Sequence, residues 1–140
     1  MKKYIKKGSD ETSLQIAISE YIKLRYKDVV FTAESSGVRV SIGTAKKMKR
    51  QRSNHKQPDM IILEPRGDYH GLIIELKKAG IRLKDGSMPN DKHTNAQKVT
   101  LDLLRSKGYY TTFAVGFDEA RKIIDDYMLY NMKITSQDNK

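Results

Sequence analysis

Two apolar stretches decide the fold of this chain, PDMIIL at 58–63 and LIIELKK at 72–78. Both are rich in aliphatic residues, and a proline is tolerated at the first position of a strand, so each is predicted to be a β-strand. The segment between them, RGDYHG at 66–71, is rich in turn residues and predicts a hairpin. Because side chains alternate across a strand, Glu75 and Lys77 are expected on one face, with Ile74 and Leu76 on the other.

The hairpin can place Asp59, near the start of the first strand, beside Glu75 of the second. Two carboxylates at close range repel each other, and they are stable together only with a cation between them or with one shared proton. Two hard oxygen ligands with spare coordination positions suit Mg²⁺, which keeps several waters and shares phosphate oxygens. The pair therefore predicts a magnesium site.

Lys77 completes a set of groups suited to the hydrolysis of a phosphodiester bond. A bound Mg²⁺ polarises a phosphate and lowers the pKa of a bound water. Lys77, on the same face as Glu75, could hold and deprotonate the attacking water or stabilise charge on phosphorus. The competing interpretation is structural, with Lys77 forming only an ion pair with Glu75 or Asp59 at a sheet edge.

The charge balance favours a polyanionic partner. Lysine and arginine number 27 against 17 aspartates and glutamates, which gives a formal net charge of +10. An excess of this size on a small domain favours nucleic acid over a merely solubilising basic surface. The stretch 45–57 contains no acidic residue and is predicted to be an exposed basic loop or arm that contacts DNA, a disordered insertion being the alternative. Its basic residues are Lys46, Lys47, Lys49, Arg50, Arg52 and Lys56.

Several classes of protein are disfavoured by what the sequence lacks. There is no cysteine, so disulfides and thiolate metal sites are excluded. No apolar run approaches the ~20 residues of a membrane-spanning helix. The basic N-terminus has no apolar stretch of the kind a signal peptide needs. We therefore expect a soluble cytoplasmic protein with no membrane partner and no small-molecule cofactor.

Hydrophobic periodicity predicts the remaining elements of a single domain at 1–130, which a polar tail follows at 131–140. The expected order is α-β-β-β-α-β-α, an α/β (α+β) fold with a mixed central sheet flanked by helices. A long loop at 80–93 is predicted to be mobile. Helices are expected at 10–27, at 94–107 with Thr94 as the cap, and from 118 onward; strands are expected at 29–33 and 109–115, with a possible short one at 38–42.

An ordered set of motifs resembles the virus-type replication-repair nuclease (VRR-NUC) branch of the PD-(D/E)XK superfamily. The set is Glu11-x-x-x-Gln15, Pro58-Asp59, Ile74-Glu75-Leu76-Lys77 and Gln97 at the opening of a helix. The likeness extends from Glu11 to about Tyr127, nearly the whole globular part. It implies a restriction-endonuclease-like core and a divalent metal, Mg²⁺ or Mn²⁺. It also implies a homodimer that cleaves branched, Holliday-junction-like DNA in phage or mobile-element replication, recombination or repair.

The resemblance also implies roles for individual residues. Asp59, Glu75 and the backbone carbonyl of Leu76 would bind the metal, and Lys77 would be catalytic. Glu11 matches an acid of the first helix that binds the metal through water. One position departs from the family pattern, because Gln57 stands where members usually have glycine before Pro-Asp.

Gln97 matches a glutamine that supports the catalytic residues in the family. Alternatives remain open at this stage for both helix residues: Glu11 could merely favour the helix dipole, and Gln97 could form a capping box with Thr94. Two further alternatives concern the whole chain. It could be a non-cleaving DNA-binding module of the same fold, or an archaeal-type resolvase of the same superfamily.

Overall fold

The computed structural model describes residues 9–34 and 39–130, so the predicted tail at 131–140 lies outside the described residues. Eight elements follow one another within these ranges, and they include every helix and strand of the predicted order together with one additional helix. They are α1 (Ser9–Arg25), β1 (Phe31–Ala33), α2 (Ile42–Arg50), β2 (Met60–Ile62), β3 (Leu72–Lys77), α3 (Lys92–Ser106), β4 (Tyr110–Val115) and α4 (Gly116–Met128).

The four strands form one mixed sheet in the order β1-β2-β3-β4, which confirms the predicted fold class. β1 pairs antiparallel with β2, and β2 pairs antiparallel with β3 through the predicted hairpin. Within the connection, the backbone groups of Arg66 and Tyr69 bond to each other in both directions. β3 pairs parallel with β4, because α3 carries the chain back to the starting edge between them.

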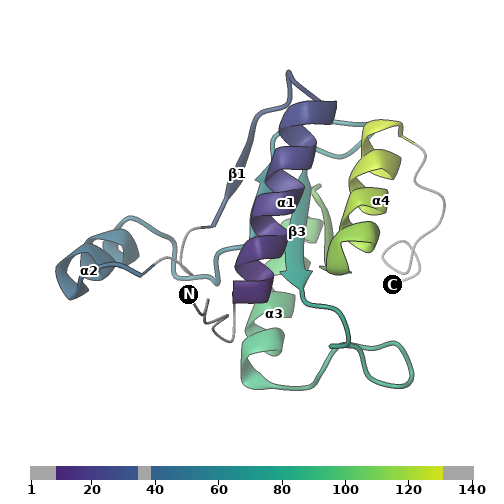
Figure 1. The fold of residues 1–140 in the computed structure, drawn as a ribbon. Coiled ribbons are helices and arrows are strands. Elements are labelled where there is room, and N and C mark those ends of the chain that lie inside the picture. Colours follow the sequence, from purple (N-terminus) through teal and green to yellow (C-terminus); the bar gives the residue numbers. More distant parts are fainter. Residues whose placement is uncertain (1–8, 35–38, 131–140) are drawn as a thin grey trace, which may run out of the picture.

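The helices cover both faces of the sheet (Figure 1). α1 and α4 lie side by side in front of β3 in this view, while α3 lies behind the sheet. α2 stands apart from these layers, beyond the edge at β1. None of the helices within the described ranges is long and apolar enough to cross a membrane.

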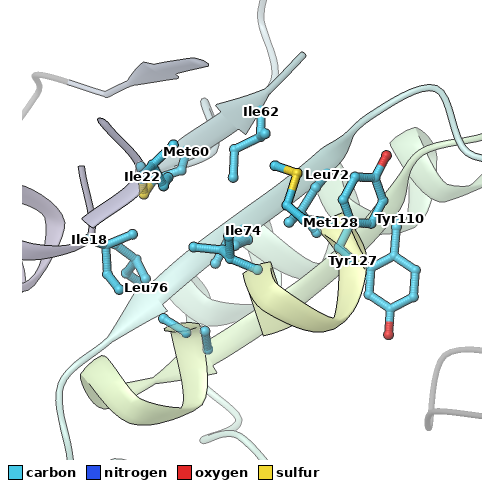
Figure 2. Close-up of a cluster of buried hydrophobic side chains, with 13 residues drawn as sticks. Ile18, Ile22, Met60, Ile62, Leu72, Ile74, Leu76, Tyr110, Tyr127 and Met128 are labelled. Atoms are coloured by element: carbon cyan, nitrogen blue, oxygen red, sulfur yellow. The ribbon is translucent and has the colours of Figure 1, made fainter. Parts of the chain in front are cut away.

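The main hydrophobic core lies between the sheet and the pair α1 and α4, as Figure 2 shows. Alternation along β3 places Leu72, Ile74 and Leu76 on this face, and all three are buried. Ile18 and Ile22 of α1 reach them from above the strand, four residues apart and therefore on one side of the helix. Packing against this core fixes where α1 lies, and α1 carries Glu11 and Gln15.

A polar contact adds to the packing of α1 on α4. Asp125 of α4 accepts hydrogen bonds from the hydroxyl of Tyr21 at 2.7 Å and from that of Tyr26 at 2.6 Å. Arg121 also donates to this carboxylate from one turn away at 3.0 Å. A partly buried carboxylate with three donors is well compensated, so the two helices are joined by more than apolar contact.

The basic stretch differs from the prediction of a loop, because its first part is the helix α2. Ser41 caps the helix by accepting a hydrogen bond from the backbone of Thr44 at 3.2 Å. Alanine, lysine, methionine and arginine all favour helix, and these propensities outweigh the repulsion among the lysines. The possible strand at 38–42 is wrong for its described part, since 39–41 is irregular and Ile42 begins α2.

The start of α3 also differs from the prediction. The N-cap is Asp91, whose side chain accepts a hydrogen bond from the backbone of Thr94 at 2.7 Å. Thr94 is therefore the third residue of the helix and not its cap. This excludes the capping box that would have given Gln97 a purely local role.

The loop at 80–93 is predicted to be mobile, and that mobility stays a prediction. In the structure it contains a turn in which Leu83 and Ser87 bond through their backbones at 2.9 Å. Arg82 also forms an ion pair with Glu119 of α4. The loop therefore has a defined path between β3 and α3.

Replacing Ile74 by alanine tests the core. The side chain is fully buried between β3 and the two covering helices, so Ile74→Ala should lower the free energy of unfolding by about 2–5 kcal/mol. Val99→Ala is the control, because Val99 is 61% exposed on α3 and should change stability by no more than about 0.5 kcal/mol. Urea unfolding measures both. Equal effects of the two changes would contradict the placement of the core.

Candidate active site

Asp59 and Glu75 lie side by side, as the hairpin predicts. Met60 pairs with Ile74, so the next positions outward in this antiparallel register bring Asp59 opposite Glu75. The backbone N–H of Asp59 donates to Glu75 Oε1 at 2.8 Å, and the backbone N–H of Leu76 donates to Asp59 Oδ2 at 2.7 Å. Each carboxylate is thus held by the backbone of the opposite strand segment. The two acidic groups have little freedom to move apart.

This arrangement destabilises the charged forms of both acids. Glu75 is only 1% exposed, and burial together with the negative charge of Asp59 raises the pKa of Glu75 to about 8. Burial is also the main cause that raises the pKa of Asp59, and Glu11 adds to it. The backbone hydrogen bonds and the positive charge of Lys77 lower the pKa of both acids, but the net shift of each pKa is upward. The pair therefore lacks enough positive charge to ionise fully at neutral pH.

Lys77 lies on the same face of β3 as Glu75 and is 4% exposed. Its Nζ lies 6.0 Å from the ring centre of Phe113 on the neighbouring strand β4. Within the described part of the chain, no ion pair joins Lys77 to Asp59 or Glu75. The aromatic ring offers a buried ammonium partial compensation for lost hydration. The close ion pair of the structural interpretation is therefore not formed, although the charge of Lys77 lowers the pKa of both acids.

A cleft of about 190 Å³ opens beside the acids. Its lining residues come in part from the start of α1, the end of β3 and the start of α3, which lie toward the lower part of Figure 1. Five of the predicted site residues line it, together with His93: Glu11, Lys56, Asp59, Leu76 and Gln97. Glu75 and Lys77 do not line the cleft and lie buried in β3 next to it. The predicted site residues thus gather at one end of the sheet.

Gln97 has a buried amide oxygen without a partner. The residue is 3% exposed, and its Oε1 accepts no hydrogen bond within the described part of the chain. An unsatisfied buried acceptor costs about 1–3 kcal/mol, so such groups usually serve a water, an ion or a substrate. Because Gln97 lines the cleft, its side-chain oxygen is suited to bind a water, an ion or a substrate there.

The donor set fits a hard divalent cation. Among the described residues, no group of three or more histidine, aspartate or glutamate side chains could hold a metal, so a metal here would depend on two carboxylates. Mg²⁺ commonly takes one or two carboxylates and fills its remaining positions with carbonyl oxygens, water and phosphate. Asp59 and Glu75, two close acids with raised pKa values, match this requirement chemically. The unpartnered oxygen of Gln97, a residue that lines the cleft, keeps its acceptor capacity for a ligand.

Two residues that the sequence did not assign to the site help to build it. The side-chain amide of Gln15 donates to the carbonyl of Glu34 at 2.8 Å and to the carbonyl of Asp59 at 3.0 Å. The backbone N–H of Glu34 also donates to the carbonyl of Asp59 at 2.8 Å. The spacing Glu11-x-x-x-Gln15 gave a signal for Gln15. Glu34 gave none, because it lies in an irregular segment after β1 with no pattern around it.

The predicted DNA-binding residues lie in three different environments. Lys46, Lys47, Lys49 and Arg50 are exposed on α2, and Lys56 lines the cleft. Arg52 differs, because its Nη2 lies 2.6 Å from Oε1 of Glu34. The basic arm therefore begins as a free surface and ends in a contact with the body of the protein.

A pH series tests the charge state of the acids. The raised pKa of Glu75 means that the folded protein holds this proton more tightly than the unfolded chain. The stabilisation that this proton gives to the fold is complete below pH 4.5, the ordinary pKa of a glutamate, and it is lost as the pH rises through about 8. In chelator, the parent should therefore lose stability over this range relative to Glu75→Gln. Urea unfolding at several pH values measures the difference, and a difference independent of pH would contradict the assignment.

The chain is similar to a solved structure, a "VRR_NUC domain protein", with 28% sequence identity and a TM-score of 0.63. The match covers 89% of this chain and 92% of that chain. No protein-family model and no curated protein matches the sequence. The mixed sheet, the order of its elements and this neighbour agree with a PD-(D/E)XK-like nuclease fold. Likeness over most of both chains supports a nuclease-family domain and the resemblance of this chain to the VRR-NUC family.

Proposed function

We propose that this chain is a Mg²⁺-dependent endonuclease that hydrolyses phosphodiester bonds of DNA. One observation carries the proposal: the buried carboxyl group of Glu75 and the half-buried one of Asp59 are fixed side by side beside a cleft, with too little positive charge to balance them. A stable fold gains nothing from such a pair, and a cation relieves the repulsion. The same pair argues against a non-cleaving DNA-binding module, which has no need of it.

The metal would be held by Asp59, Glu75 and the backbone carbonyl of Leu76, with Glu11 acting through water. Bound there, Mg²⁺ supplies polarisation of the scissile phosphate and acidifies a water, and Mn²⁺ would substitute for it. Glu11 lines the cleft and adds negative charge near Asp59. This charge strengthens the attraction of the site for a cation.

Lys77 and Gln97 would act on the attacking water and on the phosphate. The Nζ of Lys77, when neutral, can accept the proton of the water; when charged, it can bond to the phosphate oxygens as negative charge grows on them. Gln97 Oε1 can accept a hydrogen bond from the water and orient it. Its lack of any other partner within the described ranges supports this role.

DNA is the proposed substrate for two reasons: the chain has a large positive charge, and the similar solved structure is a VRR_NUC domain protein. The net charge is +10, and exposed lysines cluster on α2. By likeness to the VRR-NUC family we propose branched, Holliday-junction-like DNA as the preferred form, in phage or mobile-element DNA metabolism. Paired symmetric cuts of a junction need two related sites, so a homodimer suits this substrate.

Removal of either acid tests the metal site. Asp59→Ala and Glu75→Ala should abolish cleavage, because one metal ligand is lost. Binding of DNA should persist, because the basic surface is untouched. Glu20→Ala is a matched control, since Glu20 is an exposed acid on α1 and should leave the rate unchanged. Cleavage of linear, flap and four-way DNA is measured with Mg²⁺, with Mn²⁺ and with EDTA. Full activity in EDTA would refute the metal mechanism.

Lys77→Met separates a catalytic role from a structural one. The variant should fold and bind DNA but cut at least ~100-fold more slowly in single-turnover assays, the low end for loss of a positioned acid or base. Lys78→Met is the matched control, because Lys78 is the next residue and is exposed. Thermal melts with and without Mg²⁺ verify folding and metal binding. A folded Lys77→Met protein that cuts at the parent rate would contradict the assignment.

A further inference from the structure

We propose that Arg52 docks the basic helix α2 onto Glu34, and that this docking builds a groove which guides a nucleic-acid backbone to Asp59. The inference rests on the proposed function in taking DNA as the polyanion. It assigns Arg52 a positioning role in place of the phosphate contact that the sequence suggested. It also makes Glu34 a residue on which DNA binding depends, although Glu34 carries the same charge sign as DNA.

The position of α2 depends on few contacts. None of its residues is buried, and Met48 alone is partly buried. The helix stands outside the layers of the fold in Figure 1, so no core packing holds it. The segment that follows the helix contains Arg52, whose ion pair with Glu34 joins it to the body of the protein.

The contact between Arg52 and Glu34 is of the kind that can hold such an arm. The Glu34 side chain is only 6% exposed, and Arg52 Nη2 lies 2.6 Å from its Oε1. The contact lacks hydrogen-bond geometry, so charge attraction is what joins the two groups. A buried carboxylate that loses its cation is strongly destabilised. Arg52 therefore stays on Glu34 when a phosphate offers itself as a competing partner.

The other basic residues of the arm contrast with Arg52. Within the described part of the chain, no ion pair involves Lys46, Lys47, Lys49, Arg50 or Lys56. Their charges are uncompensated by acids and free to meet phosphates. Arg52 thus differs from these five residues, because its charge is already paired with that of Glu34.

Docking connects the arm to the strand end that carries the acids. The backbone N–H of Glu34 donates to the carbonyl of Asp59, and Gln15 bonds to the carbonyls of both. Arg52, Glu34 and Asp59 are therefore linked by consecutive contacts. A shift of the arm would therefore change the position of Asp59 through these contacts.

The docked arm forms one wall of a hollow that adjoins the cleft. This hollow has a volume of about 530 Å³ and is lined in part by Lys49, His55 and Lys56. It shares Glu34, Lys56 and Gln57 with the cleft of about 190 Å³ that contains Asp59. Together the two form a path with cations along its side and the acids at its end. A phosphodiester backbone fits this order of charges.

Exchange of the two charges tests the docking. Binding of duplex and four-way DNA is measured by fluorescence anisotropy in EDTA, so that no cleavage occurs. Arg52→Ala and Glu34→Gln should each weaken binding, by about tenfold for a loss of ~1.4 kcal/mol. The double variant Arg52→Glu/Glu34→Arg should recover most of the affinity, because it restores the ion pair in reverse. Circular dichroism checks that every variant is folded.

The opposite pattern would overturn the proposal. If Arg52 contacts phosphate directly, Glu34→Gln removes a repelling acid and leaves binding equal or tighter, while the exchanged variant binds more weakly than Arg52→Ala. If the exchanged variant does not fold, the DNA affinity of Glu34→Gln alone distinguishes docking from a direct phosphate contact. Lys47→Ala is the control for a true contact, and it should lower the salt slope by roughly 0.9 on duplex DNA.

The assay separates this inference from the proposed function. Absence of DNA binding by the parent chain would refute the choice of DNA as substrate. Binding by the parent with no loss in Glu34→Gln would refute the docking alone. Trypsin gives a readout without DNA, because α2 contains several lysines. Glu34→Gln should be cut there faster than the parent, and an unchanged rate would contradict the docking.

Discussion

Asp59 and Glu75 are held together by hydrogen bonds from the backbone, and the rest of the site depends on this constraint. The register of β2 on β3 brings the acids face to face, and the N–H groups of Asp59 and Leu76 hold the carboxylates in place. Separation of the acids would require a shift of the strands, and such a shift would move every core side chain of β3. The core therefore holds in place a pair of groups that repel each other.

The polar groups around the acids also depart from ordinary rules of packing. Lys77 is buried beside Phe113 without an acidic partner within the described residues, and Gln97 has a buried oxygen without a donor there. Each feature reduces stability, because buried charge and unsatisfied acceptors are costly. Sequences break these rules mainly where function requires it. That these two features and the repelling acids adjoin one small cleft supports a catalytic use of the site.

The basic helix is built on a different principle from the rest of the fold. α1 and α4 are positioned mainly by apolar surface, whereas α2 buries no residue and reaches the body through the ion pair of Arg52 with Glu34. An element attached in this way can present many positive charges, since it needs few of its residues for packing. Electrostatic docking also makes its position sensitive to salt.

The sequence by itself determined the hairpin, the face shared by Glu75 and Lys77, and the nearness of Asp59 to Glu75. These follow from the period of side chains along a strand and from the turn between the strands, which are local properties. The main helices and the last strand were also predictable from periodicity, apart from their ends. The gathering of Glu11 and Gln97 near the acids was expected only through the family resemblance.

The remaining features were not predicted from the sequence, and most of them were decided by tertiary structure. Local propensity favours helix in the lysine-rich stretch, but the absence of a core-facing pattern hid α2. Asp91 rather than Thr94 caps α3, because both residue types can cap and the choice depends on where the loop enters. Gln15 meets Asp59 across 44 residues of sequence, and Arg52 meets Glu34 outside any regular pairing. Such contacts depend on how the layers pack against each other, and the hydrophobic periodicity of the sequence does not predict them.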